Sequence, residues 1–182
     1  MDNLDLEELM HLAIHASSNG RNDDAINYLK KAQEIDTENA HIAFLLAAEY
    51  AQIKMYDRAL TLFEKTTQLA PELSVARLQW GLLLIMLEQS DNAKATLEPL
   101  TDLEEESPYK MFSKGLLALL EEQMDEAKAL FAKGIESNHE NEPLNNDFRR
   151  IINNIDGKLE NSESTEDTKE NANEFLLSTY NN

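Results

Sequence analysis

The sequence predicts an all-helical protein built from four stacked helix pairs, and three observations carry that prediction. An alanine recurs every 34 residues, at Ala25, Ala59, Ala93 and Ala127. Apolar residues around these alanines follow steps of three and four, which is the period of an amphipathic helix. Only short polar breaks such as SNGRND and EQSD interrupt the runs. A fixed period of this length is typical of a helical repeat array.

Four repeats account for residues 6–141, with expected boundaries at about 6–39, 40–73, 74–107 and 108–141. Each repeat is expected to hold two amphipathic helices. A large apolar residue recurs on every second helix, as Leu29, Phe63, Leu97 and Phe131.

Two prolines give local predictions within this register. Pro71 has no N–H and disfavours helix in the residue before it, so the second helix of the second repeat should end there. Pro99 falls inside the corresponding helix of the third repeat and should kink or split it.

This pattern resembles the tetratricopeptide repeat family, whose second helix carries an alanine, an aromatic residue and a proline. The second repeat fits best, with Leu46, Ala47, Tyr50, Ala59, Phe63 and Pro71. The resemblance implies a right-handed α-solenoid whose first helices line a concave groove that holds part of another protein. Small residues should let the two helices of a pair approach closely, namely Ala13, Ala47, Gly81 and Gly115.

A capping helix is expected at residues 142–156, because the last pair of an array leaves an apolar face uncovered. Pro143 suits a first helical turn, and Gly157 is the expected stop. The solenoid with its cap therefore spans 1–157, and residues 158–182 form a flexible acidic tail with a short apolar end. The apolar stripe of the cap comprises Leu144, Phe148, Ile151, Ile152 and Ile155.

Composition excludes several classes of partner. The chain has 35 acidic and 16 basic residues, and its formal net charge is −19. Such a charge repels phosphate backbones and anionic lipids, so we expect neither nucleic acid nor membrane partners. The longest apolar run, WGLLLIML, is far shorter than the ~20 residues of a bilayer-spanning helix. The acidic start lacks the basic region of a secretory signal, so we expect a cytoplasmic protein.

No catalytic, cofactor-binding or metal-binding residues are predicted, and we expect the protein not to be an enzyme. Cysteine is absent, as are a glycine-rich phosphate loop and the Gly-x-Ser-x-Gly motif. His11 and His15 lie four residues apart on one helical face, a spacing that can share a zinc ion. Without an HExxH motif this signal is weak, and the sequence leaves open whether the two histidines bind metal.

The expected binding groove is apolar. In the resembled family, members that clamp the carboxylate of a heat-shock chaperone use Lys, Asn and Arg in this groove. Here the matching places hold Met10, Ile14, Leu45, Val75 and Gln79, so no carboxylate clamp is expected. A protein or peptide with apolar anchor residues is the expected partner. The predicted groove residues are Met10, Ile14, Phe44, Leu45, Leu78, Leu82, Ile85, Met86, Tyr109, Phe112, Leu116 and Leu119.

The predicted function is therefore a non-enzymatic interaction module, an adaptor or chaperone-like protein. A more specific alternative is a chaperone for translocator subunits, because the chain resembles the small acidic chaperones of type III secretion. In two alternatives the groove is not open to another protein. It is closed either by a second copy of the chain, as in a homo-dimer, or by the chain's own tail. The tail would reach over a 16-residue tether and insert Phe175, Leu176 and Tyr180.

Overall fold

The structure is a computed structural model that describes residues 4–162, with side chains up to Gly157. Every regular element within that range is helical, as the sequence predicts. The predicted tail from residue 163 onward lies outside the described residues. The elements are α1 (Leu6–Ser18), α2 (Asn22–Ile35), α3 (Ala40–Gln52), α4 (Tyr56–Leu69), α5 (Ser74–Met86), α6 (Ser90–Leu97), the 3-10 helix η1 (Glu98–Asp102), α7 (Pro108–Leu120), α8 (Met124–Ser137) and α9 (Glu142–Ser162).

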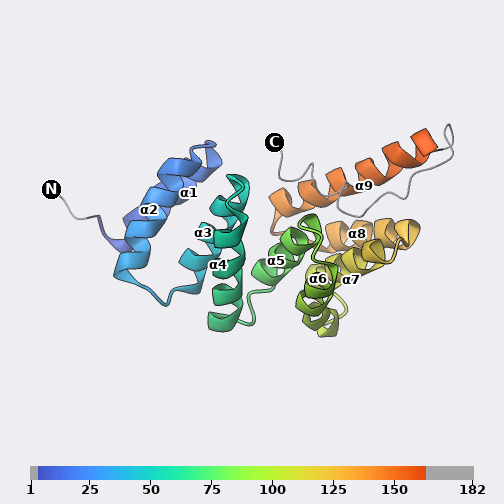
Figure 1. Ribbon diagram of the computed structural model, residues 1–182, viewed down its shortest axis with the longest axis horizontal. Coiled ribbons are helices and arrows are strands. Elements are labelled where there is room, and N and C mark those ends of the chain that lie inside the picture. Colours follow the sequence, from blue (N-terminus) through green and yellow to red (C-terminus); the bar gives the residue numbers. More distant parts are fainter. Residues whose placement is uncertain (1–3, 163–182) are drawn as a thin grey trace. The chain divides into compact units, whose positions relative to one another are not determined.

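The helices form four consecutive pairs whose starts keep the predicted register. First helices begin at Leu6, Ala40, Ser74 and Pro108, which are the first residues of the four expected repeats. Second helices begin at Asn22, Tyr56, Ser90 and Met124, again 34 residues apart. Figure 1 shows the order of the pairs along the chain.

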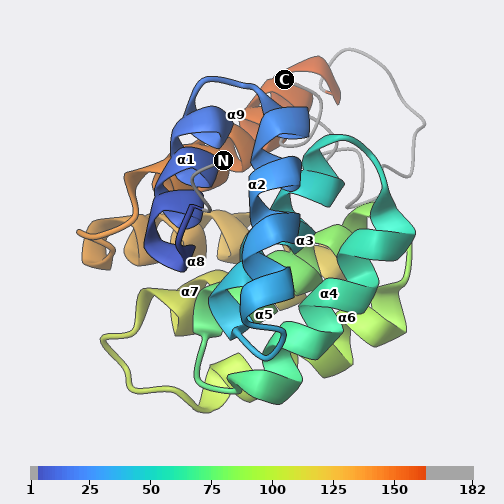
Figure 2. The same cartoon turned by 90° about the vertical axis from the view of Figure 1, so that its left-hand side faces the viewer.

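The chain divides into two compact units, Met1–Ala76 and Arg77–Asn182. In the first unit α1 packs on α2, α2 on α3, and α3 on α4, as Figure 2 shows from the side of this unit. In the second unit α6 and η1 pack near α7, α7 packs on α8, and α8 packs on α9.

Close packing within a pair depends on the small residue of the first helix. A methyl group added at Gly81 would lie 2.4 Å from Leu97 Cδ2, and one added at Gly115 would lie 2.5 Å from Phe131 Cε1. Real Cβ atoms essentially never lie this close to another atom, so an alanine at either site would force the Leu97 or Phe131 side chain to shift. Ala13 and Ala47, at the same places in the first two pairs, are at most 1% exposed. The predicted role of the small residues is confirmed at the two glycines.

Every turn between paired helices has the same backbone conformation. One residue in each turn has positive φ: Gly20 at 69°, Lys54 at 62°, Glu88 at 61° and Glu122 at 60°. The next residue donates its N–H to the carbonyl oxygen five residues back, at 2.8 to 2.9 Å in all four turns. This is a Schellman motif, which satisfies the last carbonyl groups of a helix. Glycine is the residue best suited to positive φ, yet only the first turn has it.

The two predicted proline effects are confirmed. Helix α4 ends at Leu69, two residues before Pro71. Pro99 lies in η1, and α6 stops at Leu97 after only eight residues, whereas α2, α4 and α8 have 14 each. Because proline cannot donate a backbone hydrogen bond, the α-helix changes to a 3-10 turn at this point.

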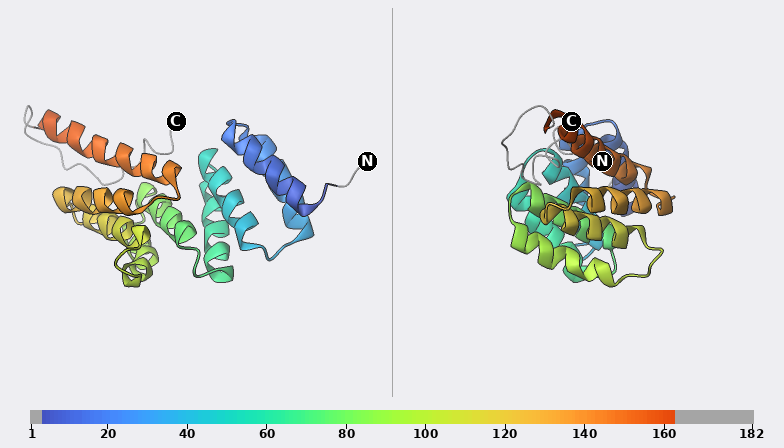
Figure 3. Two further views of the ribbon diagram at one scale, coloured as in Figure 1. Left: turned by 180° about the vertical axis from the view of Figure 1, so that it is seen from behind. Right: turned by 90° about the vertical axis from the view of Figure 1, so that its right-hand side faces the viewer.

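Helix α9 caps the second unit with an aromatic stack. The ring of Phe148 on α9 stacks on Phe112 of α7, with centroids 4.0 Å apart and planes nearly parallel, and lies 5.0 Å from Phe131 of α8. Figure 3 shows α9 running beside α8 in the view from behind. Four of the five predicted stripe residues are buried and Ile152 is half-buried. The helix passes through Gly157 and ends at Ser162, so the predicted stop at residue 157 is wrong.

A pair of buried asparagines fixes the start of this cap. Asn138 donates to Asn145 Oδ1 at 2.8 Å, and Asn145 donates to the carbonyl oxygen of Asn138 at 2.8 Å. Asn138 also accepts from the N–H of Asn141 at 3.3 Å. Lys128 of α8 bridges to Asp156 of α9 at 2.8 Å. Hydrogen bonds therefore hold α9 at its start, and an ion pair holds it near residue 156.

We predict that Glu122→Gly stabilises the protein. A non-glycine residue at positive φ costs about 1–2 kcal/mol, partly offset by the greater freedom of glycine in the unfolded chain, so we expect a gain of about 0.5–1 kcal/mol in the free energy of unfolding. Urea denaturation measures it. The reverse change, Gly20→Ala, has open space around its added methyl group and should destabilise through backbone strain alone. Loss of stability in Glu122→Gly would contradict the prediction.

We predict that Gly134→Ala destabilises the protein by about 1–3 kcal/mol, because the added methyl group overpacks the core. That group would lie 2.5 Å from Cε1 of the Phe112 ring, which the stacked Phe148 ring prevents from moving aside. Gly157→Ala is the matched control, since its added methyl group meets no atom within 4 Å. Equal melting temperatures for the two variants would show that the Phe112 ring yields freely.

Candidate partner-binding surface

The twelve predicted groove residues separate into two groups by exposure. Five keep exposed surface: Ile14 is exposed, and Met10, Phe44, Leu45 and Tyr109 are half-buried. The other seven are at most 7% exposed, which contradicts the expectation that they line an open groove. The buried seven are Leu78, Leu82, Ile85, Met86, Phe112, Leu116 and Leu119.

Phe112 shows why the pattern misled. Its ring is 0% exposed, stacks on Phe148 and fills the space left by Gly134. An apolar stripe at helical spacing is required wherever a helix packs against neighbours, so spacing alone cannot separate a core face from a groove. The cap helix, rather than a partner, occupies the predicted binding face at Phe112.

The exposed candidates concentrate in the first unit. We call the exposed parts of Met10 and Ile14 on α1 and of Phe44 and Leu45 on α3 the α1–α3 face, of which Ile14 and Leu45 line one common hollow. The side chain of Ile14 is 51% exposed, which is high for a large apolar residue. Beside it a hollow of about 90 Å³ opens between the helices. The hollow is lined by Ala13, Ile14, Ser17, Ser18, Leu29, Leu45 and Glu49.

Glu49 brings the one charge into this hollow. Its side chain is on α3, the residue is 5% exposed, and Oε2 accepts a hydrogen bond of 3.0 Å from Asn22 Nδ2 at the start of α2. The other carboxylate oxygen, Oε1, has no hydrogen-bond partner among the described residues. It is not fully buried, since the one fully buried side-chain nitrogen or oxygen without a hydrogen bond in residues 4–157 is Trp80 Nε1. Glu49 is not among the residues predicted from the sequence, although a carboxylate within the apolar run AHIAFLLAAEYAQ is a visible signal.

Comparison with known families now identifies the fold. Residues 16–79 match a family model described as "Tetratricopeptide repeat", and these residues hold the end of α1, all of α2 to α4 and the start of α5. The described helices have the fold of tetratricopeptide repeat proteins, and residues 16–79 carry the sequence pattern of that family. No curated protein gives a match.

Solved structures of tetratricopeptide repeat proteins share this fold. YrrB, described as "a TPR protein with an unusual peptide-binding site", is 25% identical, with a TM-score of 0.57 over 97% of this chain and 84% of YrrB. MamA from Desulfovibrio magneticus RS-1 is 17% identical, with a TM-score of 0.60 over 96% and 92%. A tetratricopeptide repeat protein from Parabacteroides merdae is 19% identical, with a TM-score of 0.65 over 98% and 74%. At 17% and 19% identity, the last two establish the fold alone.

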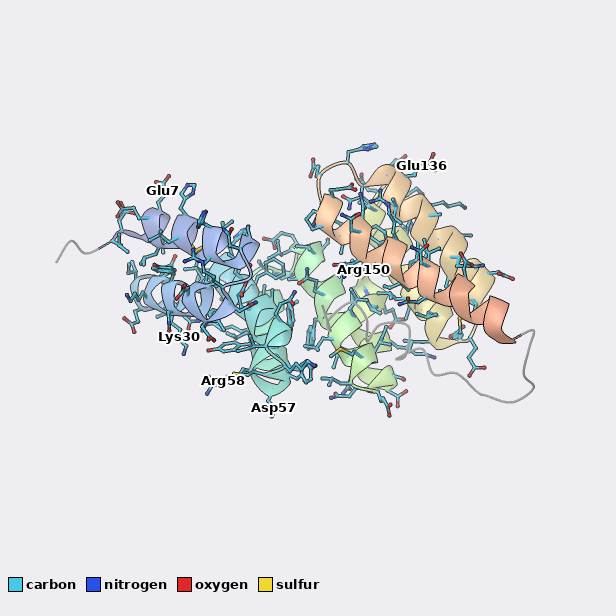
Figure 4. The ribbon with its side chains drawn as sticks, turned by 90° about the horizontal axis from the view of Figure 1, so that it is seen from above. Glu7, Lys30, Asp57, Arg58, Glu136 and Arg150 are labelled. Carbon is cyan, nitrogen blue, oxygen red and sulfur yellow. The ribbon has the colours of Figure 1, made fainter. Side chains whose placement is uncertain are left out.

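A second, more polar cleft lies between α2 and α4. It consists of two adjoining hollows of about 420 and 500 Å³ that share Lys30, Gln33 and Leu62. The guanidinium carbon of Arg58 lies 5.4 Å from the ring centroid of Tyr50 in the wall of the first hollow. Figure 4 shows Lys30 and Arg58 projecting from one side of the first unit, whereas Glu7 on α1 projects from the other.

Tyr109 is the one predicted groove residue of the second unit that keeps exposed surface. It is half-buried, and burial raises the pKa of its hydroxyl, with a further rise from the Glu140 carboxylate.

The two histidines considered for a metal site have an unfavourable neighbour. His15 Nδ1 lies 3.3 Å from Nη2 of Arg21, whose positive charge disfavours a metal ion there. Among the described residues no group of three or more His, Asp or Glu side chains could hold a metal. The predicted tail residues Phe175, Leu176 and Tyr180 lie outside the described range.

One further sequence expectation concerns membranes. Within residues 4–162, no helix combines the length and the apolar character needed to cross a bilayer.

We predict that Phe112→Gln and Ile14→Gln differ sharply in stability. The first places an amide in a sealed aromatic stack and should cost about 3 kcal/mol or more. The second changes a half-exposed position to a good helix former and should stay within about 0.5 kcal/mol. Urea denaturation of both variants provides the measurement. A large loss in Ile14→Gln would place this side chain in the core and remove it from the α1–α3 face.

Proposed function

We propose that this tetratricopeptide repeat protein is a non-enzymatic interaction module that holds an apolar segment of a partner protein on the α1–α3 face. The observation that carries the proposal is the half-exposed Ile14 side chain at the rim of the hollow that Leu45 also lines. Repeat folds of this kind present extended surfaces for binding. YrrB, described as having a peptide-binding site, supports the same use of the fold here.

The hollow takes one side-chain end, and the apolar anchors pack on the surface around it. A water molecule takes about 30 Å³ in the liquid, so about 90 Å³ admits the end of one side chain, while the anchors of the partner contact Ile14 and Leu45 at the rim. Burying one large apolar side chain contributes ~1.5–3 kcal/mol. A few such anchors, less the cost of ordering the peptide, give roughly micromolar affinity. The flexible thioether of Met10 helps the face fit irregular partners.

The proposal involves no chemistry on the partner. Binding, rather than turnover, is the role that this fold and a mostly uncharged face support. A cytoplasmic location is part of the proposal.

A random-peptide library displayed on phage and selected on the full chain tests the proposal. We expect the selected peptides to share apolar anchors and to lose about tenfold or more in affinity on the double variant Ile14→Gln/Leu45→Gln, because each anchor loses its apolar contact. Isothermal titration with synthetic copies of those peptides measures the change.

The matched control is Ile35→Gln. Ile35 is also an exposed large apolar residue, 57% exposed, but it is on α2 and outside the hollow. The control should bind the selected peptides like the unaltered chain. Peptides that bind the double variant and the unaltered chain equally well would overturn the proposal.

A further inference from the structure

We infer that the segment bound on the α1–α3 face carries a lysine or arginine whose cation pairs with Glu49. This inference rests on the proposed function and adds the chemistry of one partner residue. It assigns to Glu49 the selection of a basic side chain beside the apolar anchors.

The hollow carries a single charge, and that charge is negative. Of its seven lining residues only Glu49 ionises, and no basic residue is among them. One carboxylate oxygen accepts from Asn22, whereas Oε1 lacks a partner among the described residues and still reaches the surface. A nearly buried carboxylate that lacks a cation is costly, and a basic side chain from a partner would offset this cost.

The walls suit the rest of a basic side chain. Lysine and arginine have aliphatic stems that pack on apolar surface while their charged ends seek polar partners. Ile14, Leu29 and Leu45 supply apolar walls. Ser17 and Ser18 line the same hollow as Glu49, and the hydroxyl oxygen of Ser18, which donates to the carbonyl oxygen of Ile14 at 2.9 Å, can still accept a hydrogen bond. An ammonium group has three donors and no acceptor, so a carboxylate with a hydroxyl oxygen matches it.

The charge of the whole chain favours the same class of partner. A net charge of −19 attracts basic segments over a distance and repels acidic ones. The volume of about 90 Å³ limits the site to the end of one side chain. A single carboxylate does not make a metal site, since a bound cation of that kind needs several protein ligands.

Glu49→Gln tests the inference with little change in shape. The glutamine carbonyl can still accept from Asn22, so the link between α3 and α2 is kept while the charge is removed. Glu64→Gln is the matched control, because Glu64 is an exposed residue of α4 outside the hollow and the net charge changes equally. Urea denaturation of both variants checks that each is folded.

The readout is the phage selection described above, repeated on the two variants. We expect the unaltered chain and Glu64→Gln to select apolar anchors together with a lysine or arginine at a fixed spacing. Glu49→Gln should keep the apolar anchors and lose the basic preference. For one selected peptide, changing its basic residue to glutamine should cost about tenfold in affinity on the unaltered chain and little on Glu49→Gln.

Two results would overturn the inference in distinguishable ways. Selected peptides that depend on Ile14 and Leu45 but show no basic preference, or an equal preference on Glu49→Gln, would refute the role of Glu49 and leave the proposed function standing. Peptides that bind independently of Ile14 and Leu45 would refute the proposed function and the inference together.

Discussion

The structure depends on the distance between the two helices of each pair. Gly81 and Gly115 leave no room for a single added carbon against Leu97 and Phe131. This close approach places the large residue of the second helix in the core, where Phe63 and Phe131 are fully buried. Within each unit the next helix packs on the second helix of the pair before it, α3 on α2 in the first unit and α7 on α6 and α9 on α8 in the second. A larger residue at the small position would shift both helices and therefore every later element in the unit.

The turns within the pairs impose a second constraint, a positive φ angle, which the residue types at three of the four turns do not indicate. Lys54, Glu88 and Glu122 adopt the same positive φ as Gly20 and are followed by the same backbone hydrogen bond. Packing of the two helices must therefore outweigh a local backbone cost at three places. This explains why the 34-residue period was readable from core residues such as Ala59 and Ala93, although glycine marks only one turn.

Sequence reasoning succeeded where one residue type has one physical consequence. Pro99 breaks its α-helix because it lacks an N–H, and Phe148 is buried because it lies in the apolar stripe of a capping helix. It failed where the consequence depends on a neighbour. Phe112 has the spacing of a groove residue, but Gly134 and Phe148 enclose it. Gly157 does not stop α9, since a glycine in an exposed part of a helix weakens the helix without ending it. Glu49 was missed because its partner, Asn22, is 27 residues away.

The register of the cap has a consequence for engineering. Helix α9 begins at Glu142, 34 residues after α7 begins at Pro108, so the cap starts where the first helix of a fifth repeat would start. Helix α9 packs on the preceding pair, α7 and α8, as a first helix would, and its Phe148 contacts Phe112 and Phe131. The junction before residue 142 is thus a natural splice point. A duplicated α7–α8 pair inserted there would keep the α8–α9 interface with the terminal helix and would create one new interface, between α8 and the duplicated α7. The protein could then be lengthened one module at a time.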